Sequence, residues 1–293
     1  MKTSLKRLSL AVAMALPLPA MALSVTTTTD AGLLATTLGG SGVTIISASL
    51  IGGATQQGTF SGGGSTIGIE SGVILTSGDA TLAPGPNESD GSTGITGTGS
   101  DADLAGLIPG STIFDKNVLE LTFTTNTGNL FFSYVFASEE YNEFVNSSFN
   151  DVFGFFIDGV NIALIPGTTT PVSINNVNCG YSEGGALPGE NPSNCNLFNN
   201  NDVQNGGASF DIEYDGFTDV FTASILGLKA DTEYTIKLAI GDAGDSSLDS
   251  AVFLKAGSFT AVDPDNDVPE PATLALLGLG LAGLGLSRRR KAA

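Results

Sequence analysis

Apolar and polar residues alternate along several segments of the chain, and this alternation predicts half-buried β-strands. Residues 119–124 place leucine and phenylalanine between threonine and glutamate, and residues 130–136 repeat the pattern with aromatic side chains. The Asn-Thr-Gly-Asn stretch at 126–129 separates the two segments. We therefore predict two strands joined as a hairpin.

Further strands follow towards the C-terminus. Residues 152–157 and 160–165 are two apolar runs joined by an Asp-Gly dipeptide, which is a strong hairpin signal. Residues 234–240 alternate strictly, and residues 252–259 form a last apolar segment.

A helix is predicted only at residues 30–38, where Thr29 or Asp30 provides an N-cap. Its buried side is expected to carry Leu33, Leu34 and Leu38. The chain has 39 glycines and evenly spaced short strands, which favours antiparallel over parallel pairing. We therefore predict an all-β fold, a single antiparallel β-sandwich or jelly-roll-like domain over residues 23–260 with a short N-terminal helix.

The first 22 residues have the pattern of a secretory signal peptide. Basic residues precede an apolar run at 8–18, and an A-x-A cleavage site ends at Ala22, which predicts a mature start at Leu23. The alternative of a first transmembrane helix is disfavoured because the run is short and Pro17 and Pro19 interrupt it.

The C-terminal end has the pattern of a sorting signal. An acidic linker at 261–268 precedes a Pro-Glu-Pro motif, a short apolar run and a basic end. Residues 273–286 would form a helix of about 21 Å, against a hydrocarbon core of about 30 Å. This length favours a temporary anchor, with a permanent tail anchor as the alternative. The processing residues are Pro269, Glu270, Pro271, Arg288, Arg289 and Arg290.

The tail resembles the PEP-CTERM signal of Gram-negative bacteria. That resemblance implies recognition by an exosortase, a membrane cysteine protease, with cleavage near the Pro-Glu-Pro motif. It also implies transient anchoring in the inner membrane and transfer to the cell surface or extracellular matrix. An exopolysaccharide or biofilm setting follows from the same resemblance, with an extracellular polysaccharide or a matrix protein as partner.

The body resembles the choice-of-anchor L domain. The resemblance is carried by FASEEYNEFVNSSFNDVFGFFIDG at 136–159 and AIGDAGDSSLDSAVFLKAGSF at 239–259. Segments 33–42, 67–78 and 214–218 fall in the expected order. The family implies a surface or secreted module and supplies no established chemistry.

The charge of the body is strongly negative. Three of the 11 basic residues lie in the signal peptide and four in the tail, which leaves four lysines against 29 acidic residues and a net charge of −25. Such a surface repels nucleic acid and anionic lipid and attracts divalent cations. We expect no nucleic-acid partner.

The two family-like segments place carboxylates in irregular stretches between apolar strands. If the flanking strands are neighbours, the two stretches converge and their carboxylates repel one another. A Ca²⁺ ion would relieve this repulsion, because it accepts six to eight oxygen ligands in flexible geometry. The alternative is that these side chains cap turns. The candidate calcium ligands are Glu139, Glu140, Asp151, Asp242, Asp245 and Asp249.

Other acidic and glycine-rich segments are weaker candidates. Residues 211–216 read D-x-E-x-D-G like the start of a calcium loop, but position twelve is Thr222, so a strand ending in an Asp-Gly turn is the better interpretation. Residues 263–267 are interpreted as part of the linker. The glycines at 62–64 have no lysine and no helix after them, which excludes a phosphate-binding loop.

Cys179 and Cys195 are the two cysteines of the chain. In an exported protein such a pair is expected to form a disulfide. It would close a surface loop rich in glycine, proline and asparagine.

Catalysis is limited by the absence of histidine, which excludes Ser-His-Asp and Cys-His mechanisms. A glycosidase using Glu140 with Asp151 or Asp245 remains as an alternative, although the chain has no tryptophan for sugar stacking. We expect a non-enzymatic surface or matrix protein stabilised by Ca²⁺, with calcium-dependent glycan binding as the alternative.

Overall fold

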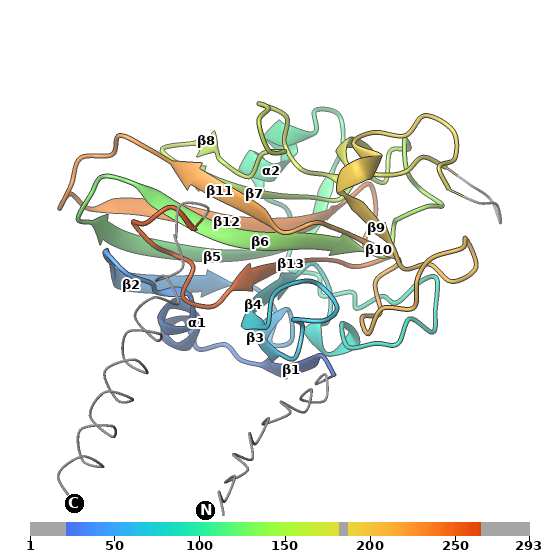
Figure 1. The fold of residues 1–293 in the computed structure, drawn as a ribbon, viewed down its shortest axis with the longest axis horizontal. Coiled ribbons are helices and arrows are strands. Elements are labelled where there is room, and N and C mark those ends of the chain that lie inside the picture. The colour runs from blue at the N-terminus through green and yellow to red at the C-terminus, as the bar shows by residue number, and fades with distance from the viewer. Residues whose placement is uncertain (1–21, 182–186, 265–293) are drawn as a thin grey trace, which may run out of the picture.

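Two antiparallel β-sheets pack face to face in the computed structural model, which describes residues 22–181 and 187–264 (Figure 1). The predicted all-β sandwich is confirmed. The first sheet follows the order β1 (Ser24–Thr27), β3 (Gln57–Ser61), β4 (Ser71–Thr76), β13 (Ser250–Lys255), β6 (Leu130–Ser138), β10 (Gly216–Thr218) and β9 (Phe198–Asn200), and β11 (Phe221–Ile225) also pairs with β6. The second sheet follows the order β2 (Val43–Ile51), β5 (Ile113–Thr125), β12 (Tyr234–Ala243), β7 (Val152–Ile157) and β8 (Val160–Asn161).

The helical elements of the described residues are short. They are α1 (Ala31–Leu38), α2 (Ala102–Leu107) and three 3₁₀ turns, η1 (Ala80–Leu82), η2 (Ile174–Asn176) and η3 (Cys195–Leu197).

The predicted hairpin between residues 119–124 and 130–136 is wrong. These residues lie in β5 and β6, which belong to different sheets. Strand β5 has β2 along one edge and β12 along the other, so neither edge is left for β6. The turn at 126–129 instead carries the chain from the second sheet to the first. Alternation within a strand predicted the strands correctly but carries no information on their partners.

The Asp-Gly hairpin is confirmed. Strands β7 and β8 pair around Asp158 and Gly159, whose φ angles of 51° and 75° are those that a tight two-residue turn requires. Strand β8 ends at Asn161, so it is shorter than the predicted segment. Strand β12 also forms as predicted, with Ile236, Leu238 and Ile240 fully buried.

The predicted N-terminal helix is present as α1. Asp30 is its N-cap and accepts a hydrogen bond from the Leu33 backbone N–H at 3.1 Å. Leu34 and Leu38 are buried, but Leu33 is 46% exposed, so its assignment to the buried side is wrong. Successive helix positions lie 100° apart, and the side of α1 that packs on the sandwich includes Leu34 and excludes Leu33.

An aromatic cluster fills the space between the sheets. Phe132, Tyr134 and Phe136 of β6 meet Phe153 and Phe155 of β7, and the closest of these ring pairs, Phe132 and Phe155, has centroids 4.8 Å apart. Each fully buried aromatic side chain contributes about 1.5 to 3 kcal/mol through removal from water.

Parts of both sheets are also covered on their outer faces. All nine residues of β6 are buried, so the prediction of a half-buried strand is wrong there. Val135 packs outside the first sheet against Ile69 and Phe253, and Leu104 of α2 packs outside the second sheet against Phe156. Loops and α2 therefore cover one part of the sandwich, and the buried polar residues at the strand ends lie there.

Candidate metal centre

The strand register brings the two predicted acidic segments together at one end of the sandwich. Ser138, the last residue of β6, lies opposite Ser250, the first residue of β13. Glu139 directly follows β6 and Asp249 directly precedes β13, and the Glu139 backbone N–H donates to the Asp249 carbonyl at 3.1 Å. In the second sheet Gly241 of β12 lies opposite Val152 of β7. Both pairs of strands are neighbours, which is the condition on which the predicted convergence depended.

Asp151 and Asp242 face each other at the end of the second sheet, but only Asp151 has hydrogen-bond partners. The Ala243 backbone N–H donates to its Oδ1 at 2.8 Å, and the Ser250 hydroxyl donates to its Oδ2 at 2.7 Å. Asp242 is 1% exposed, and neither of its carboxylate oxygens has a hydrogen-bond partner. Burial raises the pKa of Asp151 to about 7. Burial, followed by the Asp151 charge, raises the pKa of Asp242 well above its usual range.

Glu139 and Glu140 are both 1% exposed and belong to different surroundings. Burial raises the pKa of Glu140 to about 10, with the charges of Asp151 and Asp245 adding to it. Burial raises the pKa of Glu139 to about 11, with the charge of Asp215 as the next contribution. Both oxygens of Glu139 and Oε2 of Glu140 lack hydrogen-bond partners. We call Glu139, Glu140, Asp151 and Asp242 the strand-end carboxylates.

Asp245 and Asp249, the other two predicted ligands, support loops. Asp245 accepts from the Ser247 backbone N–H at 3.0 Å. Asp249 accepts from the backbone N–H groups of Gly94 at 2.8 Å and Asp79 at 3.2 Å. Burial raises the pKa of Asp249 to about 6. These two residues fit the turn-capping alternative as well as they fit a ligand role.

No lysine neutralises the strand-end carboxylates within the described ranges. The ion pairs found there join Lys237 to Asp101 at 2.7 Å and to Asp103 at 2.6 Å, next to α2. The described residues contain neither arginine nor histidine. Buried carboxylates without such a partner remain protonated or take a cation from solution.

A second acidic group lies beside these residues, and the sequence analysis missed it. Oxygens of Asp90, Asp202 and Asp215 lie within 4.8 Å of one another, and this is the one such carboxylate group found in the described part of the chain. We call these three residues the loop carboxylates. Asp215 belongs to the segment 211–216, which was interpreted as a strand ending in an Asp-Gly turn. That interpretation is wrong, because strand β10 begins at Gly216.

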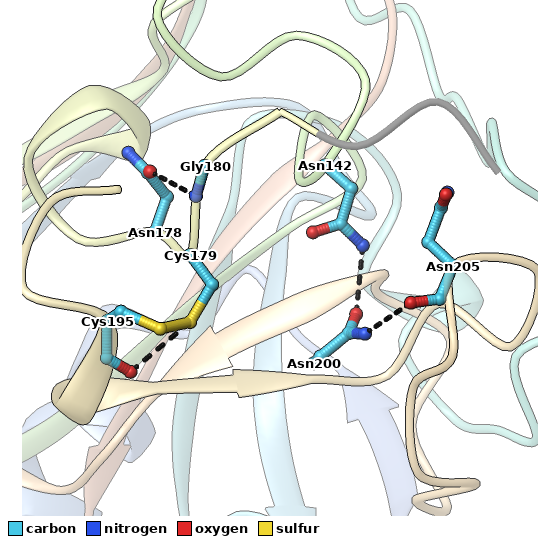
Figure 2. Close-up of a disulfide and its surroundings, with 7 residues drawn as sticks. All are labelled: Asn142, Asn178, Cys179, Gly180, Cys195, Asn200 and Asn205. Atoms are coloured by element: carbon cyan, nitrogen blue, oxygen red, sulfur yellow. Dashed lines mark hydrogen bonds between the residues drawn. A yellow bond between two sulfur atoms is a disulfide. The ribbon is translucent and has the colours of Figure 1, made fainter. Parts of the chain in front are cut away.

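The surroundings of the loop carboxylates are rich in asparagine. Asn142 donates through Nδ2 to Asn200 at 2.8 Å, and the Nδ2 of Asn200 donates to the Asn205 carbonyl at 3.0 Å (Figure 2). Asn142 Nδ2 also donates to Asp202 at 3.0 Å. The run Asn-Asn-Asn-Asp at 199–202 was the available sequence signal. It was missed because Asp90 and Asp215 are remote from it in the chain.

The predicted disulfide between Cys179 and Cys195 is confirmed and lies next to this asparagine network (Figure 2). Cys195 begins η3, and β9 follows directly. The disulfide therefore holds the segment that leads to Asp202.

Of the processing residues, Ala22 is exposed, whereas Pro269, Glu270, Pro271, Arg288, Arg289 and Arg290 lie outside the described residues. Leu23, the predicted mature start, is 4% exposed, and its backbone N–H donates to Asp211 Oδ2 at 3.1 Å. Within residues 22–181 and 187–264, no helix is both long and apolar enough to cross a membrane. The predicted short membrane segment at 273–286 lies outside these ranges.

Comparison with known families adds the identity of both parts of the chain. Residues 22–260 match the choice-of-anchor L domain, and residues 267–291 match the PEP-CTERM protein-sorting motif. No curated protein and no solved structure matches the chain significantly. The sorting motif implies export, processing by an exosortase and sorting to the cell surface in Gram-negative bacteria. The chain thus belongs to the choice-of-anchor L family, as a secreted, exosortase-sorted surface protein.

Proposed function

We propose that this protein is a non-enzymatic structural or binding component of the extracellular matrix, in a biofilm or exopolysaccharide setting, and that its body is stabilised by Ca²⁺. The ion binds between Glu140, Asp151 and Asp242, with water completing its coordination, and the partner of the mature protein is an extracellular polysaccharide or another matrix protein. The export and sorting of the chain support the location, and the acidic end of the sandwich supports the metal.

One observation carries the calcium proposal. Both carboxylate oxygens of Asp242 and Oε2 of Glu140 are buried without a hydrogen-bond partner. An unpartnered buried carboxylate costs several kcal/mol if charged. Calcium removes this cost because its ligands are oxygens and its charge offsets two carboxylates.

The glycosidase alternative fits the geometry less well. Glu140 and Asp151 are each 1% exposed. A glycosidic bond must lie between an acid and a second carboxylate, so both groups must be open to the sugar. Buried carboxylates of this kind suit a small ion better than a sugar.

The test is thermal unfolding of the exported protein in Ca²⁺ and in chelator, with Asp242→Asn as the probe. Ca²⁺ should raise the Tm in a concentration-dependent way, and Asp242→Asn should remove most of that rise. Asp231→Asn is the matched control because it changes the same charge at an exposed turn before β12, at the opposite end of that strand. An unchanged Tm across all Ca²⁺ concentrations would contradict the proposal.

A further inference from the structure

The loop carboxylates are brought together from three separate segments. Asp90 lies between η1 and α2, Asp202 follows β9, and Asp215 precedes β10. Strands β9 and β10 pair with Asn200 opposite Gly216, which sets Asp202 and Asp215 at the same end of a hairpin-like ladder. The Asn201 backbone N–H donates to the Asp215 carbonyl at 2.8 Å and continues this pairing.

The spacing of the three carboxylates suits one calcium ion. Their oxygens lie within 4.8 Å of one another. Two ligands of one Ca²⁺ ion, each about 2.3 to 2.6 Å from the metal, lie at most about 5 Å apart. The Asn205 amide donates to Glu143 Oε1 at 3.1 Å and also to Asp202. Glu143 is therefore next to this group of three carboxylates.

An unpartnered buried oxygen is the independent sign of a ligand. Asp215 is 0% exposed, and the Asn87 amide donates to its Oδ1 at 2.7 Å, while its Oδ2 has no hydrogen-bond partner. Oε2 of Glu143 is also buried without a partner. A protein group that loses water without a replacement partner is destabilising, and a cation is the replacement that suits a carboxylate.

Neutral donors hold the rest of the group in place. The backbone N–H groups of Gln204 and Asn205 donate to Asp202 Oδ1 at 2.8 and 3.0 Å. The Gln204 amide donates to Asp90. These donors orient the carboxylates but do not neutralise them. The carboxylates are therefore held in a fixed arrangement, as in a preorganised calcium site.

We propose that Asp90, Glu143, Asp202 and Asp215 bind a second Ca²⁺ ion, separate from the ion at the strand-end carboxylates. This ion ties the loop at Asp90 to the segment after β6 and to the ends of β9 and β10. Asp90 is exposed, whereas Asp202 and Asp215 are buried, so the ion has one side towards solvent. Water completes its coordination there.

The experiment counts Ca²⁺ ions. The exported full chain, kept in mild detergent, is titrated with Ca²⁺ alone by calorimetry and equilibrium dialysis. The variants are Asp215→Asn, Asp90→Asn and Asp242→Asn. Glu88→Gln is the matched control, because Glu88 is an exposed acid in the same loop as Asp90. Asp90→Asn is included because Asp90 is exposed, so this substitution is less disruptive to folding than Asp215→Asn.

The wild type is expected to bind two ions. Asp215→Asn should lose one, Asp90→Asn should weaken that same ion by about tenfold or more, and Glu88→Gln should change neither. Asp242→Asn should remove the other ion. Full stoichiometry with unchanged affinity in both Asp215→Asn and Asp90→Asn would overturn the second site. If Asp242→Asn has no effect while Asp215→Asn removes the only ion bound, the strand-end site fails and the second site stands.

Discussion

The strand-end carboxylates and the loop carboxylates are both acidic groups at the same end of the sandwich, yet they are built differently. Asp151 and Asp242 are placed by the register of two long strands, whereas Asp90, Asp202 and Asp215 are placed by loops and very short strands. Asp242 has no hydrogen-bond donor at either oxygen, whereas Asp202 has donors at both. The first group is therefore positioned by the fold itself, and the second is positioned by an asparagine network.

The largest expected effect is a pH dependence of stability in chelator. Burial raises the folded-state pKa of Glu139 from 4.5 to about 11 and that of Glu140 from 4.5 to about 10. The folded state then binds more protons than the unfolded state, so stability falls as the pH rises above about 4.5. Each proton retained changes the free energy of unfolding by about 1.4 kcal/mol per pH unit.

The measurement is urea denaturation between pH 5 and pH 8, in chelator and in Ca²⁺. Calcium should flatten the slope, because it binds the deprotonated carboxylates. A metal-free protein that is more stable at pH 8 than at pH 5 would show that these carboxyls are not held neutral by the fold.

Removal of the disulfide should affect Ca²⁺ binding at the loop carboxylates but not at the strand-end carboxylates. Replacing Cys179 and Cys195 with alanine should lower the free energy of unfolding by about 3 kcal/mol, because the cross-link limits the unfolded chain. The same substitution should also lower the affinity of the loop carboxylates for Ca²⁺, since β9 and Asp202 follow Cys195 closely. The ion that depends on Asp242 should be unaffected. Equal weakening of both ions, measured by calorimetry, would contradict this distinction.

Single substitutions should distinguish Asp242, a proposed calcium ligand, from Asp249, which supports a loop. Asp249→Asn should destabilise the protein by about 1 to 2 kcal/mol in Ca²⁺ and in chelator alike, because Asp249 binds the backbone of Gly94 and Asp79. Asp242→Asn should destabilise only in Ca²⁺, because its oxygens have no protein partner to lose. Thermal unfolding of both variants tests this, and a calcium-dependent loss in Asp249→Asn would make Asp249 a ligand.

The smallest effect is expected at Lys237, where the protein neutralises carboxylates with its own cation. Lys237→Met should cost about 1 kcal/mol or less, since Asp103 is half exposed and methionine keeps the packing of the partly buried lysine stem. Added salt should reduce this difference, and Ca²⁺ affinity should not change. A large loss of Ca²⁺ binding in this variant would mean that α2 is coupled to the acidic end of the sandwich.

Much of the fold was predictable from local sequence. Alternation in 234–240 predicted β12, the Asp-Gly pair predicted the β7–β8 turn, and Asp30 predicted the cap of α1. The burial of Leu34 without Leu33 was not predictable, because it depends on which side of α1 meets the sandwich.

The candidate site was also predictable in part, where its residues lie next to strands that local sequence predicts. The carboxylates of 136–159 and 239–259 flank long strands, so their convergence followed once those strands were taken as neighbours. The loop carboxylates come from positions 90, 202 and 215, and no periodicity links these positions.

The sequence by itself determined the long strands β5, β6, β7 and β12, the tight turn, the disulfide pair, the negative charge and the sorting motif, because each depends on residues close in the chain or on composition. It did not predict β1 to β4 or β9 to β11. The tertiary structure decided that β5 and β6 enter different sheets, that both faces of β6 are buried, and that Asp90, Asp202 and Asp215 meet. These features depend on which surfaces pack against each other over long separations. Hydrophobic burial selects that packing for the whole body at once, and no single segment encodes it.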